Sequence, residues 1–450
     1  MATREFMSGD PTRGVVLPAA GAGVEDARIT PRHRKVMVAA TLGTIVEWTD
    51  WLVYTTFASV IAQHFFPSRD PLTSLLATLA VFAVGFVARP IGGAVLGAYA
   101  DRYGRKKGLT LSILLMAGAS LVIGLCPTYT EIGVLAPIVL VAARLVQGFS
   151  AGGEFGSASA FLAETAPPSK RAFFASWQWF AINAGVLLST ILGYLTVSVT
   201  NDAELSSWGW RVGFIAAAAL GVVTLWIRRA VAESTLFEEH RAADAAPRRN
   251  PIRVVLFDRP GVALRVVGIS MAGNLLNYIW MVNYPNHAHA LAGVPLRDGL
   301  LAAIIAITIS LPLIPFVAKL ADRYGRKPIL LTFSIGSMLW AYPSFALLQP
   351  GLTMVQLTLL QTVAMILLTG YAAASAAVMS EQFPAAVRVT GIGLPYAISV
   401  TLFGGTAPYI VTWLAGSGNG SLVWVYLAFI CLVSTLTYAT MRETKGTELV

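Results

Sequence analysis

The sequence predicts an all-α integral membrane protein whose twelve transmembrane helices form two homologous six-helix halves. Three observations support this prediction. Of the 450 residues, 56% are hydrophobic and only 12% are charged, against about 25% charged residues in a soluble domain. Apolar runs long enough to cross a bilayer recur along the chain, and one charged hexapeptide occurs twice. In a membrane protein, the net charge of +9 reflects Lys and Arg on the cytoplasmic side, so we expect no nucleic-acid binding.

Twelve apolar runs separate along the chain at turn-forming residues such as Pro127 and Pro295. A transmembrane helix needs about 20 predominantly apolar residues. The predicted spans are 37–63, 73–98, 108–126, 133–163, 172–199, 210–229, 263–288, 299–319, 329–348, 353–379, 389–414 and 421–441. Because the hydrocarbon core offers no water to backbone groups, runs of this length are expected to be helical.

The charges between the spans predict the orientation in the membrane. With the amino terminus inside, 27 of the 32 Lys and Arg residues fall in cytoplasmic segments, and only Arg69, Arg211 and Arg297 fall outside. The remaining two, Arg89 and Arg144, fall within spans. This distribution follows the positive-inside rule. We therefore expect a multi-pass protein of the cell (inner) membrane with both termini in the cytoplasm.

The spans divide six and six around the longest internal hydrophilic stretch. We expect a cytoplasmic tail at 1–35, an amino-terminal half at 36–229, a cytoplasmic linker at 230–262, a carboxy-terminal half at 263–441 and a second tail at 442–450. The first tail is polar and rich in Gly and Ala, a composition typical of disorder.

Two charged motifs repeat in the same order in the two halves. The hexapeptide DRYGRK begins at Asp101 and again at Asp322, 221 residues later. The pattern Glu-x-x-Pro-x-x-x-Arg begins at Glu164 and again at Glu381, 217 residues later. Related halves around a central site are typical of transporters that alternate access.

Several stretches carry a resemblance to a known family. Residues 97–107 resemble the loop signature between spans 2 and 3 of the major facilitator superfamily. Glu47–Trp51, Arg89–Gly93 and Arg144–Glu154 further resemble its metabolite:proton symporter branch. The resemblance extends from about residue 36 to the end of the last span, and it implies the major facilitator fold and a transporter that acts as a monomer.

Ionisable residues inside a membrane are costly and mark functional sites. Five matter here: Glu47, Asp50, Arg89, Arg144 and Glu154. Glu47 and Asp50 are three residues apart and share a helix face, and two close carboxylates favour the binding of a proton by one of them.

One bound proton makes this set of three acids and two arginines neutral, which predicts proton coupling. We expect Asp50, Glu47, Arg89 and Glu154 to form the coupling network, in which the charge of a carboxylate changes its pairing with Arg89. The sequence does not choose between Glu47 and Asp50 as the proton carrier. A static set of ion pairs that neutralise one another is the alternative.

Arginine is the preferred partner of a carboxylate, so Arg144, and then Arg89, are the candidates for binding an acidic substrate. Polar and aromatic side chains near the same layer complete the predicted substrate site: Trp48, Trp51, Tyr54, Gln147, Trp177, Trp179, Asn274, Asn277 and Tyr278. The last three share a face of span 7, and a polar face on an apolar span usually points at a cavity.

The resemblance to the superfamily implies that the repeated charged motifs form a gate at the cytoplasmic mouth. The gating candidates are Asp101, Arg102, Arg105, Glu164, Arg171, Asp322, Arg326, Glu381 and Arg388. Asp101 is expected near the start of span 11, where the helix dipole favours an anion, and Arg105 beside Glu164. The second copies are expected to mirror these contacts.

The expected function is proton-coupled import of a small organic acid such as α-ketoglutarate or a related dicarboxylate. The resemblance leaves open a zwitterion of the proline or betaine type, shikimate or citrate, and an uncoupled facilitator. The sequence has no Walker A, HExxH or GxSxG pattern, which argues against an ATP-driven pump and a membrane enzyme. We expect no cofactor and no metal; the partners are the substrate, a proton and the bilayer.

Overall fold

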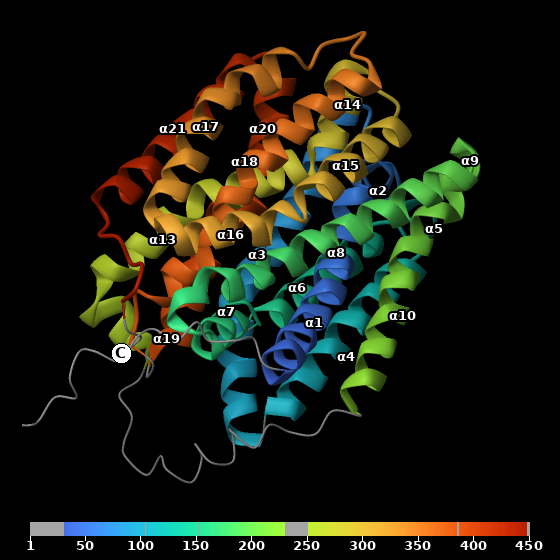
Figure 1. Ribbon diagram of the computed structural model, residues 1–450. Helices are drawn as coiled ribbons and strands as arrows, with labels where there is room; N and C mark the ends of the chain where they lie inside the picture. The colour runs from blue at the N-terminus through green and yellow to red at the C-terminus, as the bar shows by residue number, and fades with distance from the viewer. Residues whose placement is uncertain (1–30, 104, 153, 230–250, 385–386, 448–450) are drawn as a thin grey trace, which may run out of the picture.

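The computed structural model describes residues 31–103, 105–152, 154–229, 251–384 and 387–447. Within these ranges the regular structure is helical and contains no strand (Figure 1). The predicted tail before residue 31 and most of the predicted linker lie outside the described residues, so their disorder stays a prediction.

The amino-terminal half runs from blue to green in Figure 1. Its long helices are α1 (Pro31–Thr56), α2 (Ala58–Phe65), α3 (Pro71–Tyr103), α4 (Arg105–Leu125), α6 (Leu135–Ala151), α7 (Glu154–Thr165), α8 (Arg171–Val199) and α10 (Trp210–Arg229). Short turns connect them: α5 (Tyr129–Ile132), the 3₁₀ turn Pro168–Lys170, α9 (Asp202–Glu204) and a π-helical turn at Leu205–Gly209.

The carboxy-terminal half runs from yellow to red beside it (Figure 1). It begins with α12 (Pro251–Arg253) and a π-helical turn at Val254–Asp258. Its long helices are α13 (Pro260–Leu276), α14 (Tyr284–Ala292), α15 (Leu296–Ser310), α16 (Leu313–Tyr324), α17 (Arg326–Ala346), α18 (Met354–Ser380), α19 (Arg388–Ser399), α20 (Ala407–Gly416) and α21 (Ser421–Thr440). Two π-helical segments, η4 (Asn277–Val282) and η6 (Val400–Gly405), join α13 to α14 and α19 to α20.

The predicted all-helical class is confirmed, and the helices agree with twelve spans in two six-helix halves. Ten helices in the described part of the chain are long and apolar enough to cross a membrane. The third predicted span corresponds to the shorter apolar helix Thr110–Leu125, and the first to α1 followed by α2. Several spans are interrupted: α6 gives way to α7, α13 to η4, α15 to α16, and α19 to η6.

Within the amino-terminal half, α1 packs on α8, α3 on α6 and α4 on α10. The boundary with the other half is formed mainly by α8, which contacts α15, α16 and α18, and by α7, which contacts α19. The helices α8 and α18 therefore meet along the boundary between the halves.

Glycines bring the backbones of α3 and α6 into direct contact. A Cβ atom added to Gly148 would lie 1.7 Å from the carbonyl oxygen of Gly85, and one added to Gly152 would lie 2.0 Å from that of Arg89. Small residues permit such close approach of transmembrane helices. This contact sets the separation between Arg89 on α3 and Arg144 on α6.

We expect Gly148→Ala to lower the thermal stability of the purified protein, because the added methyl group meets a backbone oxygen that no side-chain rotation can move. Overpacking of this kind costs about 1–3 kcal/mol or more. The matched control is Gly118→Ala on α4, where an added Cβ meets nothing within 4 Å; we expect it to be neutral or slightly stabilising, by up to about 1 kcal/mol. Equal melting temperatures for the two variants would contradict this account of the contact.

Candidate functional site

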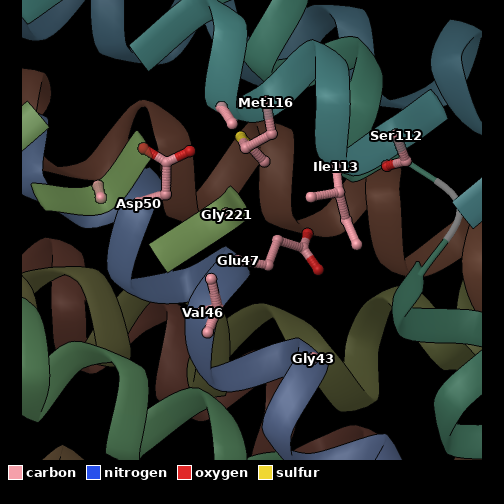
Figure 2. A pocket seen from close by; sticks show the side chains of 10 residues that line it. Gly43, Val46, Glu47, Asp50, Ser112, Ile113, Met116 and Gly221 are labelled. Carbon is pink, nitrogen blue, oxygen red and sulfur yellow. The ribbon is translucent and has the colours of Figure 1, made fainter. Parts of the chain in front are cut away.

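The two carboxylates of α1 line one small pocket in the amino-terminal half. Glu47 and Asp50 face α4 and α10 across a space of about 370 Å³, including its open mouth (Figure 2). The other lining residues are Gly43, Val46, Ser112, Ile113, Met116, Ala117, Ala217 and Gly221. Asp50 is only 2% exposed, so its carboxylate lies in a largely apolar environment.

Asp50 is held by a chain of side-chain hydrogen bonds that crosses three helices. Ser120 on α4 donates to Oδ1 of Asp50. Gln147 on α6 donates from Nε2 to Ser120 Oγ at 2.6 Å, and Arg144 donates from Nη1 to Gln147 Oε1 at 2.8 Å. The chain thus links Asp50 to Arg144 through two neutral residues.

Arg144 is completely buried within aromatic rings. Its guanidinium carbon lies 4.0 Å from the ring centroid of Trp51 and 4.5 Å from that of Tyr54. Two of its nitrogens, Nε and Nη2, have no hydrogen-bond partner among the described residues. Cation–π contacts of this type stabilise a desolvated guanidinium, and the free N–H groups leave it able to accept a further anionic or carbonyl partner.

Arg89 lies over the ring of the same tryptophan. Its guanidinium carbon is 4.4 Å from the ring centroid of Trp51, 4.5 Å from that of Phe86 and 5.6 Å from that of Trp48. The Phe86 and Trp48 rings in turn contact Tyr278 of the other half, with centroids 5.4 Å and 6.5 Å apart. Arg89 therefore faces the boundary between the halves.

This arrangement differs from the expected roles of the two arginines. The sequence favoured Arg89 as the partner of Asp50 and Arg144 as the substrate ligand. In the described part of the chain no ion pair joins Asp50 to Arg89, and the hydrogen-bond chain from Asp50 ends on Arg144. Arg89 instead lies among rings that contact Tyr278 of the other half.

A second pocket of about 240 Å³ lies between the halves. Its polar and aromatic lining comes from Trp179 and Asn183 on α8, Asn277 on η4, and Thr369 and Tyr371 on α18. Ile314, Met365, Leu368 and Ala372 complete the wall. The rings of Trp179 and Tyr371 meet edge to face, with centroids 5.0 Å apart. We call this space the central pocket.

Two buried donors at the boundary between the halves lack hydrogen-bond partners within the described residues, one of them on Trp179 of the central pocket. The indole Nε1 of Trp179 and the hydroxyl of Tyr396 have no hydrogen-bond partner among the residues that the structure describes. Tyr396 stacks on Phe155, with centroids 3.6 Å apart, and joins the two halves. Buried polar groups normally find partners, so these donors indicate a place where a polar ligand binds.

Some of the predicted substrate residues lie at or near the central pocket, and others make hydrogen bonds elsewhere in the protein. Asn277 lines the central pocket, and Tyr278 lies between Phe86 and Trp48. Tyr54 donates instead to the carbonyl oxygen of Thr78 at 2.9 Å, and Asn274 donates to Ser399 at 3.3 Å.

Trp177 was expected to line the cavity, but it packs instead with Leu162, Phe174 and Phe180, away from the central pocket. Its neighbour Trp179 lines the pocket, because positions two apart on a helix face different sides. The side chain of Glu154 lies outside the described residues.

Four residues of these regions were missed from the sequence: Asn183, Thr369 and Tyr371 in the central pocket, and Ser120 in the hydrogen-bond chain of Asp50. Thr369 shares one face of α18 with Met365, Leu368 and Ala372, a spacing of three and four residues that a search for helix faces could have found. Ser120 gives no such signal, because a serine in an apolar span is commonplace and usually bonds to its own helix.

The repeated charged motifs meet at one end of the molecule, which we call the charged end. Asp322 accepts hydrogen bonds from the backbone N–H groups of Ala172 and Phe173, both at 2.9 Å, at the start of α8. A helix N-terminus attracts an anion through its free N–H groups and its dipole. Asp322 of the carboxy-terminal half is thereby attached to the amino-terminal half.

Glu381 lies at the centre of a buried cluster at the charged end. Its side chain pairs with Arg171 of the other half at 2.9 Å and with Arg326 at 3.3 Å, and all three side chains are at most 3% exposed. Burial raises the pKa of Glu381, and the neighbouring Arg326 and Arg171 act in the opposite direction. Arg326 also pairs with Asp322 at 3.2 Å.

A second ion pair between the halves, Glu164 with Arg388, is more exposed: the glutamate side chain is 43% accessible. The side chains of Asp101, Arg102 and Arg105 lie outside the described residues, so their predicted contacts stay predictions. An additional residue, Glu443, accepts hydrogen bonds from the backbone N–H groups of Arg326 and Lys327. The sequence suggested no role for it.

Contacts also join the halves at the opposite end. The side-chain amide of Asn286 on α14 donates to the carbonyl oxygen of Thr55 on α1 at 3.0 Å. The guanidinium carbon of Arg297 lies 5.8 Å from the ring centroid of Tyr194. The central pocket therefore lies between two sets of contacts that join the halves.

The sequence matches the family described as "Sugar (and other) transporter" over residues 35–249 and 255–450. It is 33% identical to α-ketoglutarate permease of Escherichia coli strain K12 over 423 residues, covering 93% of this chain and 96% of the relative. It is also 33% identical to the glycine betaine/proline/ectoine/pipecolic acid transporter OusA of Dickeya dadantii over 443 residues, covering 95% and 86%.

A third relative, the citrate-proton symporter of Klebsiella pneumoniae, is 30% identical over 410 residues, covering 90% of this chain and 92% of that protein. Among solved structures, the major facilitator superfamily proton:xylose symporter XylE superposes with a TM-score of 0.73 at 21% identity, over 93% of this chain and 97% of that one. That likeness supports the arrangement of the helices.

We expect Glu381→Gln to open the charged end, because it leaves Arg171 and Arg326 buried without their shared carboxylate. Removing one partner of a buried ion pair costs about 3–5 kcal/mol. The measurement is aqueous maleimide labelling of a cysteine introduced at Thr369 in the central pocket, in a background where both native cysteines are alanine.

The matched control is Glu164→Gln, which removes the more exposed pair and should change labelling little, since such pairs contribute about 0–1 kcal/mol. Equal labelling in the two variants would contradict the assignment of Glu381 as the main closing contact.

Proposed function

The chain belongs to the sugar (and other) transporter family of the major facilitator superfamily, and we propose that it imports a small carboxylate-bearing metabolite together with a proton by alternating access. The proposal includes an orientation in which the charged end faces the cytoplasm and both termini lie inside. The positive-inside distribution of Lys and Arg supports this orientation. It also includes the division into halves at 36–229 and 263–441, with the protein acting as a monomer in the cell membrane.

The observation that carries the proposal is the burial of Asp50. Its carboxylate is 2% exposed, and in the described ranges it is held by Ser120 rather than by a direct ion pair. An acidic side chain inside a membrane is costly and marks a functional site by default. Binding a proton removes that charge, so Asp50 alternates between two states whose environments differ in stability. Glu47 lines the same pocket and is the second candidate.

Alternating access requires contacts that close one end while the other opens. The ion pairs around Glu381 and the attachment of Asp322 to the start of α8 support a gate at the charged end. The contact between Asn286 and Thr55 supports a second gate at the opposite end. The central pocket lies between them, as the binding site of a transporter must.

Two features support a substrate that carries a carboxylate group. Arg89 faces the boundary between the halves, and arginine is the preferred carboxylate partner. The unpartnered donors of Tyr396 and Trp179 add neutral hydrogen-bond donors nearby. We propose a small organic acid such as α-ketoglutarate or a related dicarboxylate; shikimate and citrate are variants of the same class.

A zwitterion of the betaine or proline type is the second candidate, because the lining of the central pocket is aromatic and uncharged. Trp179 and Tyr371 offer ring faces to a quaternary or secondary ammonium group, while Arg89 would hold the carboxylate. The similarity to OusA, at the same identity as to the α-ketoglutarate permease, supports keeping both classes.

We expect Asp50→Asn to abolish accumulation driven by the proton gradient while counterflow of the substrate persists, because a permanently neutral side chain carries no proton. Glu47→Gln should reduce accumulation less, since Glu47 is not part of the chain to Arg144. The measurement is uptake with and without a proton ionophore, beside counterflow in de-energised vesicles. Wild-type accumulation that survives the ionophore would favour an uncoupled facilitator, and unchanged coupling in both variants would reject this assignment.

We expect Arg89→Gln to weaken substrate binding by about 10- to 100-fold, the equivalent of one charge-assisted hydrogen bond of about 1.5–3 kcal/mol. Arg89→Lys should recover only part of the affinity, because lysine lacks the planar fork. A thermal-shift panel of organic acids and betaines identifies the ligand first. The control is Arg211→Gln at the opposite end, whose guanidinium donates to the carbonyl oxygens of Gly124 and Cys126 and lies over the ring of Trp210. Equal loss in both variants would contradict the role of Arg89.

A further inference from the structure

The hydrogen-bond chain between Asp50 and Arg144 has a fixed direction. Arginine can only donate, so the Gln147 atom facing it at 2.8 Å must be the carbonyl oxygen. The amide nitrogen of Gln147 then faces Ser120 Oγ at 2.6 Å and donates to it. Because Ser120 Oγ accepts this bond, its single hydroxyl hydrogen is free to be donated to the carboxylate of Asp50. Every donor in the chain thus points from Arg144 toward Asp50.

This direction matches a negatively charged Asp50. Hydrogen bonds to an ionised acceptor are roughly twice as strong as neutral ones, and bonds in a chain polarise one another. When Asp50 takes up a proton, it accepts a weaker bond from Ser120 or becomes a donor itself and displaces the Ser120 hydrogen. In both cases the hydrogen bond between Ser120 and Gln147 becomes weaker, and with it the bond between Gln147 and Arg144.

Arg144 is placed to pass such a change toward the other half. Its guanidinium stacks on one side of Trp51 at 4.0 Å, and that of Arg89 lies 4.4 Å from the same ring. Trp51 also meets Phe86 edge to face, with centroids 4.9 Å apart. Phe86 contacts Tyr278 across the boundary. A shift of Arg144 can therefore pass through these rings to the boundary between the halves.

We propose that Ser120 and Gln147 are positioning residues that transmit the charge state of Asp50 to Arg144, and thereby to the aromatic rings that reach the boundary between the halves. This inference rests on the proposed function, in which Asp50 carries the proton. The rival explanation is that the charge of Asp50 acts on Arg144 directly through space, with Ser120 and Gln147 serving only as packing.

The test follows the protonation of Asp50 without any substrate. In pH-difference infrared spectra of purified protein, each protonated carboxyl group contributes a C=O band. The band intensity that is absent from the spectrum of Asp50→Asn is assigned to Asp50. Ser120→Ala should move the pH midpoint of that band upward by about one to two units, the equivalent of one charge-assisted hydrogen bond. Gln147→Leu should move it in the same direction by less, although Gln147 does not touch Asp50.

The double variant distinguishes the relay from the rival. If the two residues act as one chain, Ser120→Ala with Gln147→Leu should give the midpoint of Ser120→Ala alone, within about 0.3 pH units. An unchanged midpoint in Gln147→Leu, or shifts that add in the double variant, would overturn the relay.

Two further variants control for packing. Ser270→Ala removes another fully buried serine hydroxyl, one that bonds only to carbonyl oxygens of its own helix, and should leave the midpoint unchanged. Ser120→Thr keeps the hydroxyl and should lie closer to the wild type than Ser120→Ala; it also tests the relay if the alanine variant fails to fold. A midpoint as far shifted in Ser120→Thr as in Ser120→Ala would contradict the relay.

Failure of the relay and failure of the proposed function give different results. If Asp50→Asn removes the infrared band and gradient-driven accumulation, but Gln147→Leu leaves the midpoint unchanged, the relay fails and the proton role of Asp50 stands. If no Asp50 band develops over the pH range in which the protein stays folded, both are contradicted.

Discussion

The burial of one carboxylate, Asp50, is the constraint on which the rest of the site depends. A charge in the hydrocarbon layer must be compensated, and here the nearest compensation is a hydroxyl group rather than a cation. Ser120 needs Gln147 to complete its bonding, and Gln147 needs Arg144. The positions of α1, α4 and α6 are therefore tied to the charge of a single group, which is the property that a proton-driven conformational change needs.

In the proposed mechanism, contacts at the two ends of the molecule define the states between which the charge of Asp50 selects. At the charged end the contacts between the halves are ionic and largely buried, around Glu381 and Asp322. At the opposite end, the neutral side-chain amide of Asn286 donates a hydrogen bond to the carbonyl oxygen of Thr55, and the guanidinium of Arg297 lies over the ring of Tyr194. The asymmetry implies that closure at the charged end depends on ion pairing, while closure at the other end depends more on packing.

Much of the fold could be predicted from the sequence, because the membrane itself requires long apolar spans and favours Lys and Arg on the cytoplasmic side. The two halves followed from repeated motifs, and Asp50 and Arg144 from the cost of burying charge. The partner of Asp50 could not be predicted: axial spacing placed Arg89 in its layer, but the hydrogen-bond chain from Asp50 ends on Arg144. Spacing alone did not choose between Trp177 and Trp179, of which Trp179 lines the central pocket. Ser120 carries no signal until three helices are brought together.

The central claim is that substrate and proton cross together because Asp50 alternates between charged and neutral forms. The most direct measurement is the internal pH of proteoliposomes, reported by a trapped dye, when a transported compound is added outside without a pre-formed gradient. Substrate-dependent acidification by the wild type, absent in an Asp50→Asn protein that still exchanges substrate, is the predicted result. Uptake by the wild type with no change in internal pH, or acidification that persists in Asp50→Asn, would contradict the account.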